Sequence, residues 1–150
     1  RGVYTHWQRT FLHPMLKAFD APSREECTAQ RSRSNTPLQA LTLLNDPTFV
    51  EAARGLAVRM MQHDAATAAD RVRWAYQEAV SRPPTAEMER ILVEVYEKHR
   101  EEFRQAPASA QELTSVGVAP KPEDLDVVEL AAWTNVARII LNLHEVITRY

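Results

Sequence analysis

Two helix-start signals in the first half of the chain restrict how it can fold. At the first, the Thr36 hydroxyl can cap a helix, Pro37 suits the first helical position, and Gln39 can reach back as in a capping box. At the second, Asp46 follows Asn45 and can accept backbone N–H groups, and Pro47 opens another helix. The two signals predict a short helix over about residues 37–44 and a longer one over residues 47–62.

Helix-forming residues prevail in the rest of the chain. Only 3 glycines occur in 150 residues, and long stretches are rich in Ala, Leu, Glu, Arg and Met. The spacing of apolar residues predicts a third helix that stops at Ser81, and a fourth helix that is capped by Thr85 and runs to about residue 105. The inward faces expected for the three long helices are Phe49, Ala52, Ala53, Leu56 and Met60; Val72, Ala75, Tyr76, Ala79 and Val80; and Met88, Ile91, Leu92, Val95 and Phe103.

The last third of the chain reads as a loop followed by one helix. Residues 106–122 combine prolines and Gly117 with small polar residues, which predicts a long surface loop. Asp124 is then expected to cap a final helix within residues 123–150. This helix is apolar over most of its circumference, so we expect it at the centre of a bundle. Its polar stripe consists of Thr134, Asn135, Arg138, Asn142, Glu145 and Arg149. We expect Arg138, Asn142, Glu145 and Arg149 to face solvent, with Glu145 and Arg149 as an i,i+4 ion pair, or alternatively to face a partner domain.

Residues 1–35 show no clear period, because Tyr4, Trp7, Phe11 and Phe19 are scattered among charges. We therefore expect an irregular arm wrapped on the bundle. The fold class predicted is all-α: an irregular bundle of four main helices plus one short helix, with an irregular N-terminal arm. Residues 1–150 are expected to form a single helical domain, with helices over residues 36–105. Because the chain opens on Arg1 rather than on Met, we expect it to be a piece of a longer polypeptide.

Composition excludes several classes of protein. With 45% hydrophobic and 25% charged residues, the chain has the balance of a globular domain, and no run of about 18 apolar residues could span a membrane. Residues 1–45 carry a net charge of +3 and the remainder −5, which does not make the strongly basic face of a nucleic-acid-binding domain. The only cysteine is Cys27, so an internal disulfide, a Cys-rich zinc site and a haem attachment motif are excluded.

Three segments together carry a family resemblance. The first is Phe19-Asp20-Ala21-Pro22 with Cys27 shortly after; the second runs from Arg33-Ser34-Asn35-Thr36-Pro37 to Leu44-Asn45-Asp46-Pro47; the third is Glu129-Leu130-Ala131-Ala132-Trp133-Thr134 with Leu141-Asn142-Leu143. They resemble the C-terminal domain of unknown function of planctomycete-type multidomain proteins that often also carry a cytochrome-c-like domain. The resemblance extends from Arg1 to the end, and the chain looks like the C-terminal part of that longer, planctomycete-specific domain.

The resemblance implies a helical module that belongs to a larger, exported polypeptide, hence an extracytoplasmic location in the periplasm or at the cell surface. It implies other domains of the parent polypeptide as partners, and it supplies no reaction and no catalytic residues. Haem belongs to a separate domain of such proteins, so no cofactor is expected in this chain. The chain departs from the family at His144, where an acidic residue is common.

One polar cluster is the candidate site: Asp20, Arg31, Arg33, Asn35, Asn45 and Asp46. Two guanidiniums beside a helix N-terminus suit an anion such as phosphate, sulfate or carboxylate. The simpler interpretation is that these residues cap helices and pin the arm, with Arg31 or Arg33 paired to Asp20 or Asp46. Capping accounts for Asp46 but leaves the arginines and Asn35 unexplained.

Catalytic and metal chemistry have little support. Asp20 and Asp46 are the only candidates for an acid–base pair, and no feature of the sequence brings them together. The five histidines are dispersed without the spacing of metal ligands, so no metal site is predicted. Two functions follow as expectations: a non-catalytic structural or docking module, or a ligand-binding or hydrolytic part that acts on an anionic or carbohydrate-like substrate through Arg31, Arg33, Asn35 and Asp46. Whether the chain is an enzyme stays open.

Overall fold

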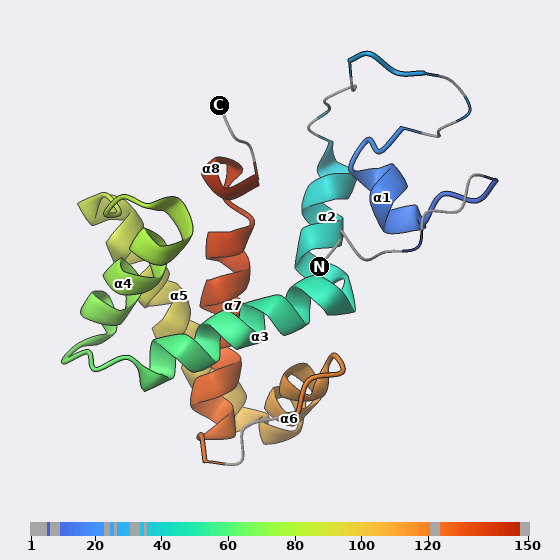
Figure 1. Ribbon diagram of the computed structural model, residues 1–150. Coiled ribbons are helices and arrows are strands. Elements are labelled where there is room, and N and C mark those ends of the chain that lie inside the picture. The colour runs from blue at the N-terminus through green and yellow to red at the C-terminus, as the bar shows by residue number, and fades with distance from the viewer. Residues whose placement is uncertain are drawn as a thin grey trace. The chain divides into compact units, whose positions relative to one another are not determined.

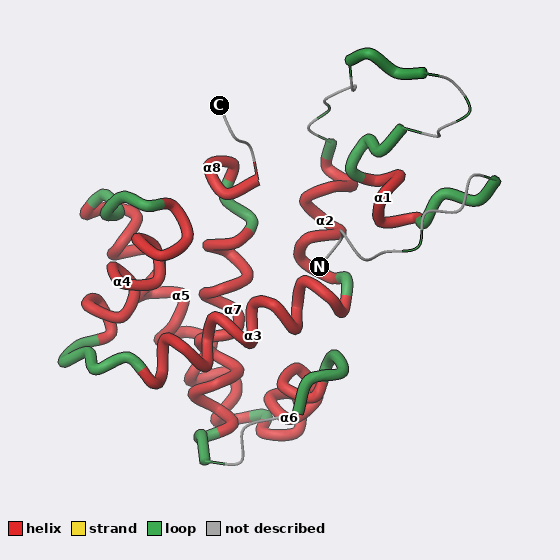
Figure 2. Tube along the Cα trace, viewed as in Figure 1, coloured by secondary structure: helices red, strands yellow, loops and turns green. Residues whose placement is uncertain are grey.

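The computed structural model describes residues 6, 10–22, 25, 27–30, 34, 36–120 and 124–147. Within these residues it contains eight helices and no strand, which confirms the all-α class (Figures 1 and 2). The chain divides into two compact units, Arg1–Thr42 (unit 1) and Leu43–Tyr150 (unit 2), which are described separately below.

The helices found in the described residues agree in part with those expected. They are α1 (Pro14–Ala18), α2 (Pro37–Asn45), α3 (Pro47–Gln62), α4 (Ala68–Val80), α5 (Ala86–Gln105), α6 (Pro107–Ser115), α7 (Val127–Leu141) and α8 (His144–Ile147). The four longest, α3, α4, α5 and α7, are the four main helices of the prediction, and α2 is its short helix. Helices α1, α6 and α8 were not predicted from the sequence.

The capping predictions are confirmed in three of four cases. The Thr36 hydroxyl accepts the Gln39 N–H at 3.3 Å while Gln39 Oε1 accepts the Thr36 N–H at 3.3 Å, the reciprocal bonds of a capping box. Asp46 caps α3 and Thr85 caps α5. The fourth cap is wrong, because Asp126 rather than Asp124 accepts the Glu129 N–H at the start of α7.

Unit 1 contains α1 and the first part of α2. The prediction of an irregular arm is wrong for Pro14–Ala18, where Pro14 opens a five-residue helix and the Nδ1 atom of His13 accepts the Met15 N–H at 3.3 Å. The chain turns directly after α1, where Asp20 adopts a φ of +56°. Such a φ is uncommon outside glycine, but aspartate tolerates it better than most residues.

Unit 2 is built around α7, as expected for the most apolar helix. In the described part of the chain α3, α4, α5 and α6 all pack against α7, and α3 crosses it (Figure 1). The buried residues of α7 are Leu130, Ala131, Ala132, Trp133, Thr134, Val136, Ala137 and Ile140. Two residues expected to face inward are exposed instead, Ala52 on α3 and Ile91 on α5. Ion pairs at the surface include Arg73 with Glu89, between α4 and α5.

Much of the predicted loop over residues 106–122 is helical, so that prediction is wrong for Pro107–Ser115. Pro107 occupies the start of α6, where its missing N–H and fixed φ are tolerated. Ala110 and Thr114 are fully buried, and α6 packs against α7. Tertiary burial therefore explains a helix whose own sequence, rich in small polar residues, indicates a loop.

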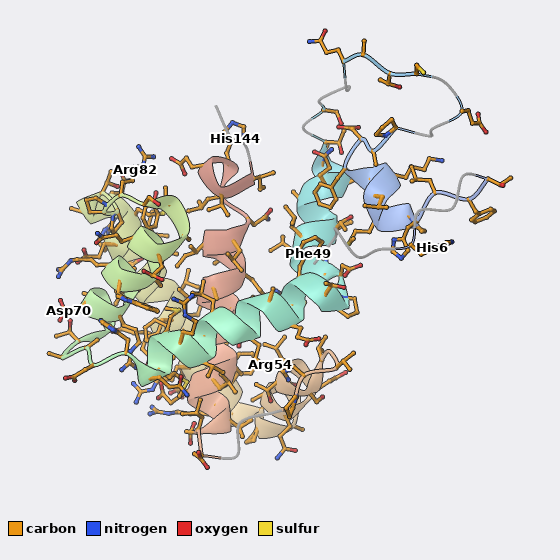
Figure 3. All side chains as sticks on the ribbon, in the orientation of Figure 1. His6, Phe49, Arg54, Asp70, Arg82 and His144 are labelled. Atoms are coloured by element: carbon orange, nitrogen blue, oxygen red, sulfur yellow. The ribbon has the colours of Figure 1, made fainter. Side chains whose placement is uncertain are left out.

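The prediction of a single final helix within residues 123–150 is also wrong. The N–H of Asn142 closes α7 on the carbonyls of Arg138 and Ile139, and α8 begins two residues later. Glu145 on α8 forms an ion pair with Arg82. Arg82 follows the last residue of α4, whereas Asp70 lies near the start of that helix (Figure 3). Arg149, the partner predicted for Glu145, lies outside the described residues.

The polar stripe of α7 does not face solvent throughout, which corrects a further expectation. Thr134 is fully buried, and its hydroxyl donates to the Leu130 carbonyl at 2.6 Å. Arg138 is partly buried, and its guanidinium donates to the Leu44 carbonyl and, at 3.0 Å, to Asn135 Oδ1. Burial lowers the pKa of Arg138. Both residues are satisfied inside the protein, so the expectation of a solvated face is wrong for Arg138.

Candidate functional site

Asp20 lies at the centre of a hydrogen-bonded cluster in unit 1. Its Oδ2 atom accepts the backbone N–H of Ser34 at 2.8 Å and the Ser34 hydroxyl at 2.6 Å. The same oxygen accepts the Gln39 amide at 3.3 Å. The carboxylate therefore joins the turn after α1 to the residues that lead into α2.

Gln39 completes this cluster from the first turn of α2. Its Nε2 donates to the Ser34 hydroxyl oxygen at 3.1 Å as well as to Asp20, while its Oε1 accepts the Thr36 N–H. Gln39 is only 6% exposed, so a buried amide has both its donor and its acceptor satisfied. One side chain thus closes the capping box and holds the preceding segment.

Of the other predicted site residues, the structure describes Asn45 and Asp46, which lie where α2 ends and α3 begins. Arg31, Arg33 and Asn35 lie outside the described residues. Asn45 is the last residue of α2, and Asp46 caps α3 by accepting the Thr48 N–H on Oδ1 at 2.9 Å. Asp20 belongs to unit 1 and Asp46 to unit 2. Among the described residues, Ser34 and Gln39 donate hydrogen bonds to Asp20, and neither is one of the six predicted site residues.

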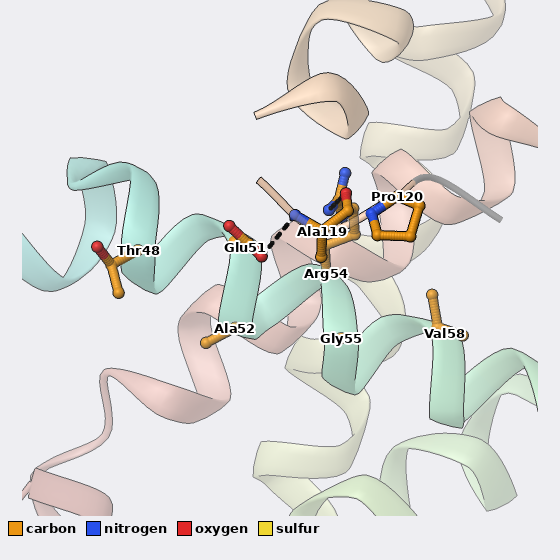
Figure 4. A pocket seen from close by; sticks show the side chains of 8 residues that line it. All are labelled: Thr48, Glu51, Ala52, Arg54, Gly55, Val58, Ala119 and Pro120. Atoms are coloured by element: carbon orange, nitrogen blue, oxygen red, sulfur yellow. Dashed lines mark hydrogen bonds between the residues drawn. The ribbon is translucent and has the colours of Figure 1, made fainter. Parts of the chain in front are cut away.

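A shallow groove runs along α3 in unit 2, with a volume of about 500 Å³ (Figure 4). Its lining residues are Thr48, Glu51, Ala52, Arg54, Gly55, Val58, Ala119 and Pro120. Exposed small side chains of α3 form its floor, and the segment after α6 forms one wall. No sequence pattern predicts this groove, because the residues of its two sides lie far apart in the chain.

Both charged residues of the groove are bonded to the backbone of the segment after α6. The two oxygens of Glu51 accept the N–H groups of Val118 at 2.7 Å and Ala119 at 2.9 Å. The guanidinium of Arg54 donates to the carbonyls of Thr114 and, at 2.7 Å, Ala119. The hydrogen bonds from Val118 and Ala119, aided by the charge of Arg54, hold the pKa of Glu51 below its usual value.

A second polar cluster lies among α4, α5 and α7. The rings of Tyr96 and Trp133 stack with centroids 4.0 Å apart, and the Tyr96 hydroxyl donates to Glu129 Oε2 at 2.6 Å. Arg100 pairs with the other oxygen of Glu129 at 2.6 Å, and the guanidinium of Arg71 lies 5.6 Å from the centre of the Trp133 ring. Burial and the hydrogen bond to Glu129 raise the pKa of Tyr96 to about 12. The Tyr96 phenol is therefore a hydrogen-bond donor at neutral pH.

In these three clusters the carboxylates act as hydrogen-bond acceptors for groups of the protein itself. The carboxylates of Asp20, Asp46 and Glu51 accept backbone N–H groups, and that of Glu129 accepts a phenol and pairs with an arginine. In the part of the chain that the structure describes, no group of three His, Cys, Asp or Glu side chains gathers in a way that could hold a metal ion. Over the same residues, no helix is both long and apolar enough to cross a membrane.

Comparison with known proteins relates the chain to a family of unknown function. No curated protein and no solved structure matches the chain significantly. The sequence model of one family matches residues 1–96, which include the first two segments of the resemblance, while the third segment, around Trp133, lies beyond the matched region. Since the match covers more than half of the 150 residues, the chain belongs to the PSD1 family of proteins of unknown function (DUF1553).

Proposed function

We propose that this chain is a non-catalytic structural or docking module of a larger extracytoplasmic protein, and that it packs against other domains of the same polypeptide through α2. The observation that carries the proposal is that α2 buries a polar side chain and exposes two large apolar ones. Its polar Gln39 is buried, whereas Leu38 and Leu41 are 60% and 57% exposed.

The composition of α2 suits a docking surface. Its nine residues, Pro37–Asn45, include no charged side chain. Leu38 and Leu41 are three residues apart, so they lie on the same side of the helix. Full burial of a leucine side chain contributes about 1.5–3 kcal/mol. A partner that covers both leucines would therefore gain stability without having to desolvate a charge on α2.

The internal use of polar groups supports a structural role over a catalytic one. Asp46 serves as the N-cap of α3, and Asp20 fixes the segment before α2 through Ser34 and Gln39. Each of these carboxylates accepts hydrogen bonds that stabilise the backbone or side chains around it. The extracytoplasmic location and the parent polypeptide rest on the family resemblance described above.

Cysteine labelling in the full-length polypeptide encoded by the gene tests the proposal. In a Cys27→Ser background, Leu41→Cys reports on α2, and Val118→Cys, at a site that is 96% exposed in unit 2, is the matched control. Each maleimide labelling rate is read by peptide mass spectrometry and divided by the rate for the same cysteine in denaturant. If another domain covers α2, the native rate at position 41 falls at least about tenfold below that at position 118.

Two results would overturn the proposal. One is labelling at position 41 as fast, relative to denaturant, as at position 118. The other is a gene that encodes no domain beyond this chain. A Leu38→Glu, Leu41→Glu double variant gives a second reading, because a charged α2 should release the covering domain and raise its susceptibility to limited proteolysis, whereas an uncovered α2 should tolerate both charges.

A further inference from the structure

Residues 116–120, which we call the strap, follow α6 and are tied to α3 by two side chains of opposite charge. Glu51 accepts two consecutive N–H groups of the strap, and Arg54 donates to the Ala119 carbonyl within it and to the Thr114 carbonyl just before it. Bonds from a carboxylate or guanidinium to neutral groups are stronger than those between neutral groups. The strap is therefore held chiefly by charge-assisted bonds to α3.

Gly117 allows the strap to approach α3 this closely. Its φ is +103°, a conformation that favours glycine, and a Cβ atom at this position would lie 2.1 Å from Glu51 Oε2. The backbone therefore rests directly on the Glu51 carboxylate. Ala119 and Pro120 then form one wall of the groove on α3, and Figure 4 shows this wall together with the hydrogen bond that the Ala119 N–H donates to Glu51.

The ionised state of Glu51 controls these bonds. Residues 114–120 contain no ionisable side chain. Among the charged side chains of α3 and of the helices around it, α4, α6 and α7, the one that acts on Glu51 is Arg54. Arg54 is only 4% exposed although it carries a positive charge. A protonated Glu51 would accept the two N–H groups more weakly and would remove a negative charge that interacts with Arg54.

We propose that the strap is an acid-released cover: it is closed over Arg54 while Glu51 is ionised, and it opens when Glu51 takes up a proton. Opening removes the wall made by Ala119 and Pro120 and uncovers a buried cation on α3. The lowered pKa of Glu51 gives the direction of the effect. The closed strap is stabilised above the pKa of a free glutamate and loses that stabilisation as the pH falls through the lower pKa of the bound carboxylate.

Amide hydrogen exchange measured by NMR tests this proposal on the intact chain. The protection of the Val118 and Ala119 amides is followed between neutral and acidic pH and corrected for intrinsic exchange, with the amide of Ala137 in the core of α7 as the reference. Protection at both strap amides should fall in acid while Ala137 stays protected.

Glu51→Gln should lower strap protection at least about tenfold at neutral pH and abolish its pH dependence. Glu112→Gln, which neutralises an exposed carboxylate on α6, is the matched control and should leave both unchanged.

Each other outcome counts against the proposal. Equal strap protection in Glu51→Gln and the unaltered chain at neutral pH would show that the carboxylate does not hold the strap. The same pH dependence in both would place the titrating group elsewhere. If Glu51→Gln also loses protection at Ala137, the variant is destabilised as a whole, and the test then uses the pH series of the unaltered chain. In that series, strap amides that lose protection at the same pH as Ala137 would overturn the proposal.

Discussion

Tyr96 of α5 stacks on Trp133 of α7 with an angle of 17° between the ring planes, and its hydroxyl reaches the Glu129 carboxylate one turn earlier on α7. Trp133 is only 1% exposed, so the stack lies in the core of unit 2. The contact fixes α5 against the central helix through both apolar area and a charge-assisted hydrogen bond.

Alkaline pH should weaken unit 2 through Tyr96. The pKa of this phenol is raised from 10 to about 12, so its contribution to folding is complete below pH 10 and is lost as the pH rises through 12. Thermal unfolding between neutral pH and pH 12 should show this decline. Tyr96→Phe should lower the free energy of unfolding by about 0.5–1.5 kcal/mol at neutral pH and flatten the alkaline decline. Tyr76→Phe is the control, and an equal flattening by it would contradict the assignment.

Truncation of Trp133 should be among the most destabilising single changes in unit 2. Trp133→Ala removes the largest fully buried side chain and should cost about 3–5 kcal/mol in chemical denaturation. Trp133→Phe retains a ring against Tyr96 and removes an indole N–H that has no partner among the described residues, so it should cost less. Equal losses for the two variants would mean that the stack contributes little.

Removal of the α3 cap should have a moderate effect. Asp46→Ala deletes the acceptor of the Thr48 N–H and should cost about 0.5–2 kcal/mol of stability. Asp64→Ala changes an exposed aspartate after α3 and serves as the control for loss of charge. An unchanged melting midpoint for Asp46→Ala would show that this cap contributes nothing to folding.

Two glycine substitutions should shift stability in opposite directions. Gly55 lies inside α3 with nothing within 4 Å of an added Cβ, so Gly55→Ala should raise the free energy of unfolding by about 0.4–1 kcal/mol. Gly117→Ala forces a strained φ and displaces Glu51, and it should cost about 1–3 kcal/mol. Melting temperatures compare the two directly, and a stabilised Gly117→Ala would show that the strap does not require glycine.

The sequence predicted best what depends on neighbouring residues. Thr36, Asp46 and Thr85 were expected as caps and are caps, because each side chain bonds a backbone N–H two or three residues further on. The same local reasoning named Asp124 where Asp126 is the cap, because both residues offer a carboxylate and the packing of α7 decides which one begins the helix.

For the candidate cluster, the sequence predicted the capping bond of Asp46 but not the hydrogen bonds of Asp20. Asp20 binds Ser34, 14 residues away, through a turn with a positive φ that no periodic pattern reveals. The roles of Arg31, Arg33 and Asn35, and whether the cluster binds an anion, stay predictions.

By itself the sequence determined the all-α class, the four main helices and the central position of the last long one, because helix propensity, capping and apolar periodicity are properties of short segments. Tertiary structure decided that α6 is a helix, that Thr134 and Arg138 are satisfied inside the protein, and that Glu51 holds the strap. The N–H group that Glu51 binds at Val118 lies 67 residues further along the chain. Such contacts depend on how helices pack in three dimensions, and spacing along the chain carries no record of them.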